Sequence, residues 1–378
     1  MDEVRIGMAG YAFMGKAHSN GWRQAPHFFP GIPRPRLQVI CGRDERALQG
    51  AAGQLGWQNT ETDWRKMVRR EDVDVVDIVT PGDSHAAIAI AAAEAGKHVI
   101  CEKPLANSLA EAKAMLAAAQ KAKVRHMVLF NYRRVPALAL ARQMIAEGRL
   151  GRLFHFRAQY LQDWIVDPQF PRVWRLDKSI AGAGALGDLG AHIIDLAHYL
   201  AGPVREVRAT TVTMIGERPL PGQPRQMAPV TVDDAAIFFG KIQRQEGEVT
   251  ASFEVSRLAT GRKNYLGLEI NGSQGSLRFN LERQNELEYY DRTLPEKMQG
   301  WNNIMVTEAS HPYIAHWWPA GHMLGYEHAF VHACADFLAA LQMKTELHPD
   351  FADGVACNAV LDAVERSAQS GKTEPVQI

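Results

Sequence analysis

The chain has 378 residues, more than one ordinary core accommodates, so two domains are expected. Lysine plus arginine and aspartate plus glutamate balance at 42 each, so charge gives no reason to expect a nucleic-acid or anionic-membrane partner. The chain starts with a strand pattern rather than a signal peptide, and its four cysteines are scattered without a Cys-x-x-Cys pair. These features favour the reducing cytoplasm, without disulfides or structural zinc.

Strand-like and helix-like segments alternate through the first third of the chain. Apolar runs predict the strands, and helical periodicity, with a capping box of Ser108 and Glu111, predicts the helices. This alternation predicts a parallel sheet with helices on both faces, an α/β domain over residues 1–131. In chain order the expected elements are strand 4–9, helix 14–25, proline-rich loop 26–36, strand 37–41, helix 45–55, strand 73–80, helix 84–95, strand 98–102, helix 108–121 and strand 125–131.

The pattern changes in the middle of the chain. After a helix expected over 136–147, apolar and polar residues alternate, with Phe154, Phe156 and Ala158 on one face of a strand. Consecutive strands without intervening helices predict an α+β domain over residues 132–378 with an antiparallel or mixed sheet. Its further expected elements are helix 188–200, strands 204–213, 231–240, 248–255, 265–270 and 276–280, a hairpin joining the last two, and helices 326–341 and 351–370.

A glycine-containing turn links the first expected strand to the first expected helix. Gly10, Ala12 and Gly15 have the G-x-A-x-x-G spacing of a dinucleotide-binding turn, with Phe13 and Met14 between them. Gly10 would allow the tight turn, Ala12 the close approach of a pyrophosphate, and Gly15 close helix–strand packing. The alternative is a plain strand-to-helix turn, but its place at the head of a β/α series favours NAD or NADP binding.

The end of the second strand decides between NAD and NADP in such domains, because an acid there binds a ribose hydroxyl and an arginine accepts a 2′-phosphate. This chain has Gly42, Arg43 and Asp44 at that point. Gly42 removes the acid from its usual place, Arg43 could hold a phosphate or lie in solvent, and Asp44 could still reach the ribose. The sequence leaves NAD and NADP open, with Arg43 and Asp44 as candidate cofactor contacts.

Two segments carry candidate proton-transfer groups. Lys103 follows the strand expected over 98–102, at the edge where parallel strands present ligands, and could donate to a substrate hydroxyl. Asp188 and His192 are four residues apart on one expected helix, so their side chains share a face. Oxidising an alcohol requires removal of its O–H proton, and a histidine beside a carboxylate is a suitable base. The alternatives are a loop lysine, a capping aspartate and a core histidine.

Polar and aromatic residues precede this helix. Rings stack on the apolar faces of sugars, while amides and carboxylates bind their hydroxyls. We expect substrate contacts from Gln162, Asp163, Trp164 and Trp174; core packing is the alternative for the tryptophans.

One repeat raises the question of a metal. His328, His332 and Asp336 recur every four residues on the helix expected over 326–341. The sequence shows no second segment with matching ligands, and a polar helix face is the better interpretation. We expect no metal.

Five motifs follow one another in a fixed order along the chain. They are the Gly10-to-Gly15 turn followed by Lys16-Ala17-His18, then Thr80-Pro81 with His85, Glu102-Lys103-Pro104, Asn131-Tyr132-Arg133-Arg134, and Gly187-Asp188 with His192. Their order and spacing resemble those of the Gfo/Idh/MocA family of oxidoreductases. The resemblance implies an N-terminal α/β Rossmann domain and a C-terminal α+β domain. The sheet of the second domain would be large and mostly antiparallel, and in the family it often builds a homodimer or homotetramer.

The resemblance also implies roles for individual residues. Lys103, before a cis bond to Pro104, would be the catalytic lysine and would contact both cofactor and substrate. His192 would accept the proton, with Asp188 as its substrate-binding or orienting partner. The residues implied to border the nicotinamide, its ribose or the substrate are Thr80, Pro81, His85, Glu102, Asn131 and Arg133.

These features together predict an NAD(P)-dependent oxidoreductase acting on a CH–OH group. Within the family the resemblance is strongest to members that oxidise levoglucosan. It implies oxidation of a secondary ring hydroxyl, at C3, of a levoglucosan-like sugar or related pyranoside. An inositol or another polyol is an alternative substrate. Two other classes stay open: a glycoside hydrolase or lyase that uses NAD transiently, and a non-catalytic sugar sensor. The expected partners are a small-molecule substrate and further copies of the chain, without nucleic acid or membrane.

Overall fold

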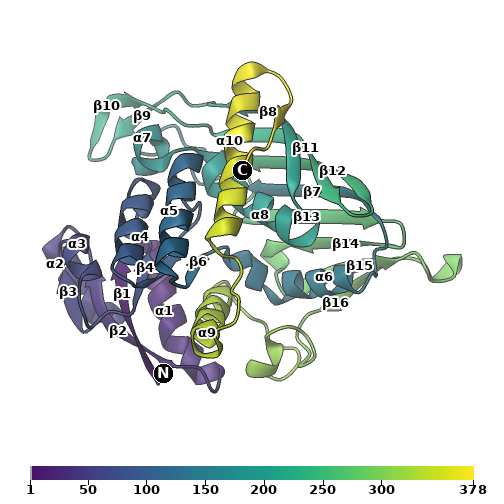
Figure 1. Ribbon diagram of the computed structural model, residues 1–378. Helices are drawn as coiled ribbons and strands as arrows, with labels where there is room; N and C mark the ends of the chain where they lie inside the picture. Colours follow the sequence, from purple (N-terminus) through teal and green to yellow (C-terminus); the bar gives the residue numbers. More distant parts are fainter. Residues whose placement is uncertain (1) are drawn as a thin grey trace. The chain divides into compact units, whose positions relative to one another are not determined.

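The computed structural model describes residues 2–378, which form two compact units (Figure 1). The first comprises the residues up to Arg134 together with Leu324–Val355, and the second comprises Val135–Met323 together with Ala356–Ile378. The first unit therefore adds a distant segment to the domain predicted over 1–131, because helix α9 (His328–Met343) packs against α1 (Phe13–Phe28). Helical periodicity indicates that α9 is a helix, but it does not identify the helix that α9 packs against.

A six-stranded parallel sheet forms the core of the first unit. Its strands are β1 (Glu3–Ala9), β2 (Arg34–Cys41), β3 (Asn59–Glu61), β4 (Val75–Ile78), β5 (His98–Cys101) and β6 (His126–Val128). They lie in the order β3-β2-β1-β4-β5-β6. The order reverses between β1 and β4, which creates a crevice at the carboxyl ends of these strands.

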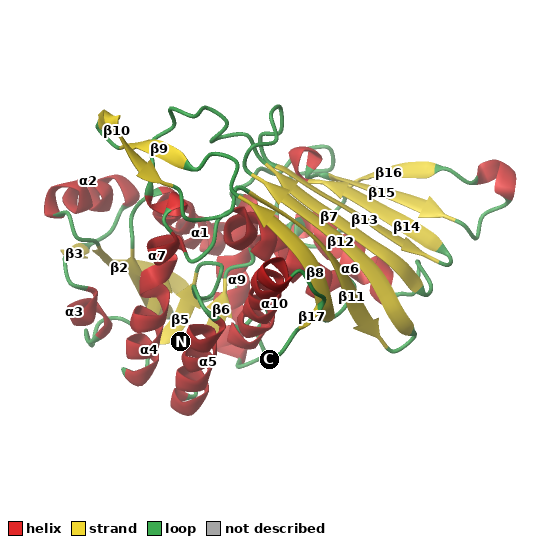
Figure 2. Cartoon of the chain, turned by 90° about the horizontal axis from the view of Figure 1, so that it is seen from above, coloured by secondary structure: helices red, strands yellow, loops and turns green. Residues whose placement is uncertain are grey.

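Helices cover both faces of this sheet. Besides α1 and α9 they are α2 (Glu45–Leu55), α3 (Trp64–Val68), α4 (His85–Glu94) and α5 (Leu109–Ala122). The pair α4 and α5 lies on one side of the sheet and the pair α1 and α9 on the other (Figure 2). Side-chain N-caps start three of these helices: Asp44 caps α2, Asp63 caps α3, and Ser108 with Glu111 forms the predicted capping box of α5.

Helix α1 is longer than its periodicity predicts. It continues to Phe28 and includes Pro26, whereas the proline content predicts a loop over 26–36. Pro26 cannot donate to the carbonyl of Trp22 one turn earlier, and the helix ends two residues after it, at Phe28. Strand β2 also starts early, at Arg34. The predicted loop is therefore wrong at both of its ends.

A nine-stranded mixed sheet forms the core of the second unit (Figure 1). Its strands are β7 (Leu153–Leu161), β8 (Val204–Val212), β11 (Ala235–Arg244), β12 (Gly247–Ser256), β13 (Tyr265–Gly272), β14 (Gly275–Asn280), β15 (Glu286–Asp291), β16 (Trp301–Met305) and β17 (Glu374–Pro375). Their order is β16-β15-β14-β13-β7-β12-β11-β8-β17. Strands β7 and β12 run parallel, whereas the other neighbouring pairs of this sheet in the described chain are antiparallel. The predicted α+β class of this domain is confirmed.

Helices pack against one face of this large sheet. Helix α6 (Pro136–Ala146) contacts β14 and β15, and α8 (Ala191–Leu200) contacts β7 and β8. Figure 1 shows both helices in front of the sheet, and α10 (Phe351–Ser370) has the bounds that its sequence predicts. Side chains alternate along β11, with Phe238 buried and Phe239 62% exposed. The face opposite the helices thus presents apolar side chains to solvent.

One helical stretch, Lys178–Leu200, is long and apolar enough to cross a membrane by length and composition. It contains the short helix α7 (Lys178–Ala181), a π-helical turn (Leu186–Gly190) and α8. In the structure 78% of its most apolar window is buried, as in the core helix of a globular unit.

Two segments add strands that alternation does not predict. Strands β9 (Glu217–Leu220) and β10 (Gln223–Pro229) form a separate two-stranded hairpin. Strand β9 contains one proline and β10 contains two, and proline weakens a strand pattern because it cannot donate to a neighbouring strand. In contrast, the predicted hairpin β13–β14 is confirmed, with Asn271 opposite Ser276.

Candidate active site

The predicted cofactor residues of the first unit lie at one edge of its sheet. They follow the carboxyl ends of β1, β2, β4, β5 and β6, which are parallel and therefore end at the same edge. This edge includes the point between β1 and β4 where strand order reverses. Ligands of open α/β sheets bind at this kind of position.

The turn after β1 fits a dinucleotide pyrophosphate. Gly10 has φ of 108°, and a Cβ there would lie 2.9 Å from the carbonyl oxygen of Val79. A Cβ on Gly15 would contact the Gly10 carbonyl oxygen at 3.0 Å, so this glycine allows helix and turn to pack closely. Ala12 is the N-cap residue of α1, and within residues 2–378 no side chain caps this helix. Its first backbone N–H groups therefore suit an anion.

The two residues inside this turn differ in exposure. Phe13 is 62% exposed, and its ring stacks on Tyr326 of the same unit, with centroids 6.3 Å apart and an interplanar angle of 15°. Met14 is half-buried. The exposed aromatic face of Phe13 is consistent with the predicted contact to cofactor.

The turn after β2 explains why this chain has glycine where related domains have an acid. A Cβ on Gly42 would lie 2.1 Å from the ring of Tyr11, so the tyrosine occupies the space that a longer side chain needs. Asp44 accepts a hydrogen bond of 2.9 Å from the backbone N–H of Ala47 as the N-cap of α2. Arg43 is exposed. The structure thus gives Asp44 a capping role, and it leaves the predicted ribose contact untested.

A buried ionic network lies directly beneath the segment that carries Lys103. The imidazole of His18 faces Asp77 with Nδ1, 3.0 Å from each carboxylate oxygen, and faces Glu102 Oε1 with Nε2 at 2.9 Å. Trp22 donates to Asp77 at 2.8 Å. The second oxygen of Glu102 accepts the backbone N–H of Lys103 at 3.1 Å. His18 thereby connects the helix after the glycine turn to the backbone of the predicted catalytic lysine.

His18 carries a proton on each ring nitrogen in this arrangement, since both nitrogens face carboxylate oxygens. Burial alone would lower the pKa of His18, but the charges and hydrogen bonds of Asp77 and Glu102 outweigh it and raise the pKa to about 10. The network therefore holds an imidazolium between two carboxylates.

The loop after β4 is tied to the segment after β5. His85 Nε2 lies 2.9 Å from the carbonyl oxygen of Thr80, and its Nδ1 lies 3.2 Å from that of Pro104. The peptide bond between Lys103 and Pro104 is cis, as the family resemblance implies. Pro81 lies between Thr80 and a one-turn helix, Gly82–Ser84. His85 thus joins two loops that were predicted to border the nicotinamide.

The turn after β6 contains Asn131 and Arg133, both buried. Arg133 donates to Asp353 at 3.2 Å, which gives this arginine an ion-pair partner in the first unit. Its predicted role at the border of the substrate stays a prediction.

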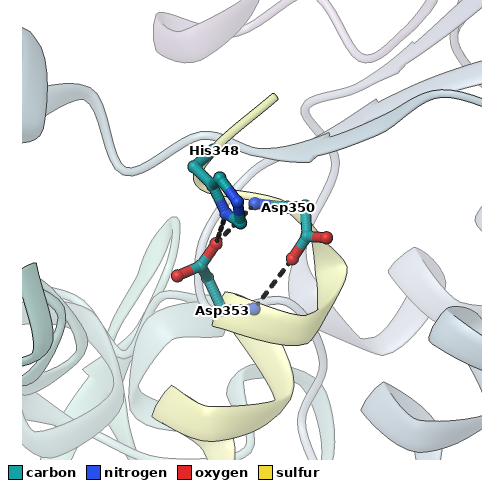
Figure 3. A group of neighbouring side chains, drawn as sticks. All are labelled: His348, Asp350 and Asp353. Carbon is teal, nitrogen blue, oxygen red and sulfur yellow. Dashed lines mark hydrogen bonds and ion pairs between the residues drawn. The ribbon is translucent and has the colours of Figure 1, made fainter. Parts of the chain in front are cut away.

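Asp353 belongs to a group with metal-binding residue types, the one such group found among residues 2–378: His348, Asp350 and Asp353. Asp350 accepts the N–H groups of Ala352 and Asp353, and Asp353 accepts the N–H of Asp350 (Figure 3). His348 Nδ1 also lies 2.8 Å from Asp353. These bonds cap the start of α10 and explain the cluster without an ion.

The histidine repeat on α9 likewise has structural partners. His332 lies 2.8 Å from the carbonyl oxygen of Arg134, and Asp336 accepts from the guanidinium of Arg134 at 2.9 Å. His328 bonds to the backbone of Gly325.

In the second unit, Asp188 and His192 lie on consecutive turns of one helical run. Asp188 is in the π-helical turn and His192 in the first turn of α8. Single π-helical turns occur frequently at functional sites. The His192 side chain is buried, with its ring 5.7 Å from that of Tyr160 on β7. Asp188 Oδ2 lies 3.2 Å from a guanidinium nitrogen of Arg257, which directly follows β12.

The predicted sugar contacts gather near the carboxyl ends of the parallel strands β7 and β12. Gln162 donates to Asn264 at 2.7 Å. Lys263 pairs with Asp163 at 2.8 Å, and this hydrogen bond and the N–H of Gly261 lower the pKa of Asp163. These bonds hold the loops after the two strands together.

The two tryptophans have different surroundings. Trp164 packs edge-on against Phe170, at 5.2 Å between centroids, beside a small apolar cluster that includes Ile165 and Leu176. Trp174 is 36% exposed and carries the guanidinium of Arg175 over its ring at 4.4 Å. Core packing therefore accounts for much of Trp164, whereas Trp174 keeps an exposed ring.

Comparison with known families identifies the chain. Residues 4–130 match a model described as an oxidoreductase family with an NAD-binding Rossmann fold, and residues 138–278 match the Gfo/Idh/MocA C-terminal domain. The chain belongs to the Gfo/Idh/MocA oxidoreductase family. It is therefore an oxidoreductase with an NAD-binding Rossmann domain, and the predicted fold and enzyme class are confirmed.

Relatives within this family match over almost the whole length. The levoglucosan dehydrogenase of Pseudarthrobacter phenanthrenivorans is 42% identical over 97% of each chain. A crystal structure of an oxidoreductase domain protein from Kribbella flavida is 53% identical over 100% of both chains, with a TM-score of 0.96. A levoglucosan dehydrogenase solved with NADH and levoglucosan is 42% identical over 100% of both chains, with a TM-score of 0.95.

Sequence motifs do not reveal several of the contacts that hold these segments in place. His18 is part of a recognised motif, but its bonds to Asp77 and Glu102 depend on how α1 packs against the sheet. Arg257 has no motif around it, and its bond to Asp188 spans 69 residues. The register of the large sheet is needed to find such a pair.

Proposed function

We propose that this enzyme oxidises a secondary ring hydroxyl, at C3, of levoglucosan or a closely related pyranoside, with NAD as the acceptor. Full-length similarity to a levoglucosan dehydrogenase is the observation that carries the proposal. Solved relatives of this kind contain NADH, one of them together with levoglucosan. More distant relatives include D-apiose and inositol dehydrogenases, at 26% and 25% identity, so a polyol is the alternative substrate.

The proton-transfer group in this proposal is His192. The reaction removes a hydride from the carbinol carbon and a proton from its oxygen, and leaves a ketone. Nicotinamide, when bound, accepts the hydride. His192 would take the hydroxyl proton, Asp188 would orient the sugar or the imidazole from the preceding turn, and the ammonium of Lys103 would stabilise the developing charge on oxygen.

NAD is the proposed cofactor over NADP. The N-terminus of α1 lacks acidic residues in its first turn and suits the pyrophosphate common to both cofactors. Tyr11 fills the space above Gly42, and Asp44 keeps a carboxylate at the end of β2, where it would repel a 2′-phosphate. Arg43 is exposed and could move toward a phosphate, so the preference is tested directly with both cofactors.

The decisive experiment measures reduced-nicotinamide absorbance with levoglucosan, inositols, glucose and glycosides, each with NAD and with NADP. We expect net NADH formation with levoglucosan. His192→Ala and Lys103→Met should each lower kcat by roughly a hundredfold or more, because general acid–base groups contribute that much. His27→Ala and Lys297→Met change exposed residues of the same types and should leave kcat within about twofold of wild type.

The same assay separates the other classes. Sugar cleavage with no accumulation of NADH would indicate a hydrolase or lyase that uses the cofactor transiently. Tight sugar binding without turnover would indicate a sensor. Either result would contradict the proposed dehydrogenase.

We also propose that the chain forms a homodimer or homotetramer through the open face of the nine-stranded sheet. Ile237 and Phe239 on β11 are 49% and 62% exposed on that face. Adjacent exposed apolar side chains on one sheet face are candidates for an interaction surface. Phe239→Glu should reduce the mass measured by analytical ultracentrifugation, whereas Phe154→Glu, a change at an exposed aromatic residue on strand β7 of the same sheet, provides a comparison.

A further inference from the structure

A fully buried arginine lies at the junction of the segments that carry the second unit's predicted catalytic and sugar-binding residues. Arg257 directly follows β12 and is 1% exposed. A buried guanidinium is costly to remove from water unless its N–H groups have acceptors. The identity of those acceptors therefore shows what this residue holds in place.

Arg257 connects three segments through its side chain. Its Nη2 donates to the carbonyl oxygen of Gly184 at 2.7 Å and to Asp188 Oδ2 at 3.2 Å. Its Nη1 donates to the carbonyl oxygen of Arg175, next to Trp174, at 3.3 Å. The guanidinium carbon also lies 5.7 Å from the centroid of the Trp164 ring. One cation thus touches the helix of Asp188 and both tryptophan-bearing loops.

The start of that helix is held from the other side by Asp233. Its two carboxylate oxygens accept the N–H groups of Gly184 and Leu186, each at 2.7 Å, and its carbonyl oxygen accepts that of Ala185 at 3.0 Å. A Cβ on Gly184 would lie 1.8 Å from the Asp233 carbonyl oxygen, so only glycine permits this approach. Gly184 is therefore fixed by Asp233 at its N–H and by Arg257 at its carbonyl, four residues before Asp188.

We propose that Arg257 is a positioning residue for proton transfer, which orients the Asp188 carboxylate and fixes its helix against the loops of Trp164 and Trp174. The inference rests on the proposed function, in which Asp188 and His192 handle the hydroxyl proton. Arginine suits this role because its planar fork binds two carbonyls and a carboxylate at once, which a lysine ammonium cannot match in geometry.

The charge of Arg257 has a consequence beyond packing. A cation beside Asp188 offsets part of the carboxylate's effect on His192, four residues along the same helical run. Other ionisable groups on the elements around the pair are Asp195, buried three residues after His192 on α8, Tyr160, whose ring lies 5.7 Å from that of His192, and Asp233 and Asp234. The proposed function adds Lys103. Removing the guanidinium should make His192 more basic, so the base should become active only at higher pH.

The test compares Arg257→Lys with Arg257→Met in the full chain, with levoglucosan and NAD. Arg257→Met should lower kcat by roughly a hundredfold and move the acid limb of the kcat/KM profile to higher pH, by about half a pH unit or more. Arg257→Lys keeps the charge but loses the fork, so it should lower kcat by about tenfold without moving that limb. The Kd for NAD, measured by fluorescence titration, should stay unchanged in both variants.

A double-mutant cycle with Asp188→Asn separates positioning from general damage. If Arg257 acts through Asp188, adding Arg257→Met to Asp188→Asn should cost less than about threefold further in kcat. Equal losses in both backgrounds, or a Met variant with an unshifted limb, would overturn the inference while leaving the proposed function intact.

The inference can still be tested if Arg257→Met does not fold, or if Asp188→Asn has no effect on turnover. If thermal melting shows that Arg257→Met does not fold, the pH profile of kcat/KM and the double-mutant cycle are measured with Arg257→Lys. The inference requires this variant to have a lowered kcat and an unshifted acid limb. If Asp188→Asn itself leaves turnover unchanged, both the proposed function of Asp188 and this inference are wrong.

Discussion

The two units hold their candidate catalytic segments with different cations. In the first, the imidazolium of His18 lies between Asp77 and Glu102, and Glu102 in turn holds the backbone of Lys103. In the second, the guanidinium of Arg257 holds Asp188 and two backbone carbonyls. Both cations are buried beside a carboxylate. An imidazole can lose its charge at accessible pH, whereas a guanidinium cannot.

The partners of the two cations differ as well. His18 is held by side-chain carboxylates, so its contribution to the free energy of unfolding depends on buried charges that compensate one another. Arg257 is held largely by carbonyl oxygens, so its contribution depends on backbone geometry. We therefore expect changes in the first network to affect mainly stability, and changes in the second to affect mainly turnover.

The largest expected effect is the loss of stability on Asp77→Ala. This variant removes the acceptor of both His18 and Trp22 and leaves a buried cation with one carboxylate instead of two. Breaking a buried pair in this way costs about 3–5 kcal/mol. We expect a marked fall in the thermal unfolding temperature, measured by circular dichroism with and without NAD.

A matched control is Glu3→Gln, which removes a carboxylate from an exposed pair with Arg36 in the same unit. It should change stability by less than about 1 kcal/mol. An Asp77→Ala protein that melts together with this control would show that the buried network contributes little.

The sequence predicted much of the first unit because its signals are local. Helix α2 has the bounds that its periodicity predicts, and the Ser108–Glu111 capping box is present. The glycine turn, Lys103, Asp188 and His192 were found by spacing and position after strands. Strand β15 was not predicted, since its sequence mixes acidic and aromatic residues without clear alternation.

The supporting residues could not be predicted for a different reason. The partners of Arg257 are set by the register of β12 and by a π-helical turn that periodicity does not reveal. Asp233 and Gly184 approach closely across 49 residues, and a glycine in the sequence does not show which backbone it approaches. Motifs therefore predict the candidate reacting groups, whereas the three-dimensional structure identified what holds them.

Asp233→Ala should lower stability less than Asp77→Ala does, but it should lower turnover more. The variant leaves the N–H groups of Gly184 and Leu186 without their acceptor, which costs about 1–3 kcal/mol. Because these groups begin the helix of Asp188, kcat should fall by roughly tenfold or more. Steady-state kinetics with NAD and levoglucosan measure the loss.

Asp291→Ala provides the comparison for this variant, because Asp291 accepts a backbone N–H in an exposed turn of the same unit. It should lose a similar bond with kcat unchanged. Asp233→Asn, whose amide oxygen can still accept one bond, should fall between the two. A kcat for Asp233→Ala equal to that of Asp291→Ala would show that the clamp does not position Asp188.

The last expected effect is a difference in how stability responds to pH. The pKa of His18 is raised to about 10 in the folded chain, from about 6.5 in an unfolded one. Protonated His18 therefore contributes its full stability below pH 6.5 and loses it progressively as the pH rises toward 10. The difference in melting temperature between wild type and His18→Gln should be largest at pH 6 and should shrink by pH 9.5. The corresponding difference for Arg257→Lys should stay nearly constant from pH 6 to 9, because both side chains remain charged there. Parallel curves for the two comparisons would mean that His18 is not an imidazolium, and the contrast between the two units would then be one of geometry alone.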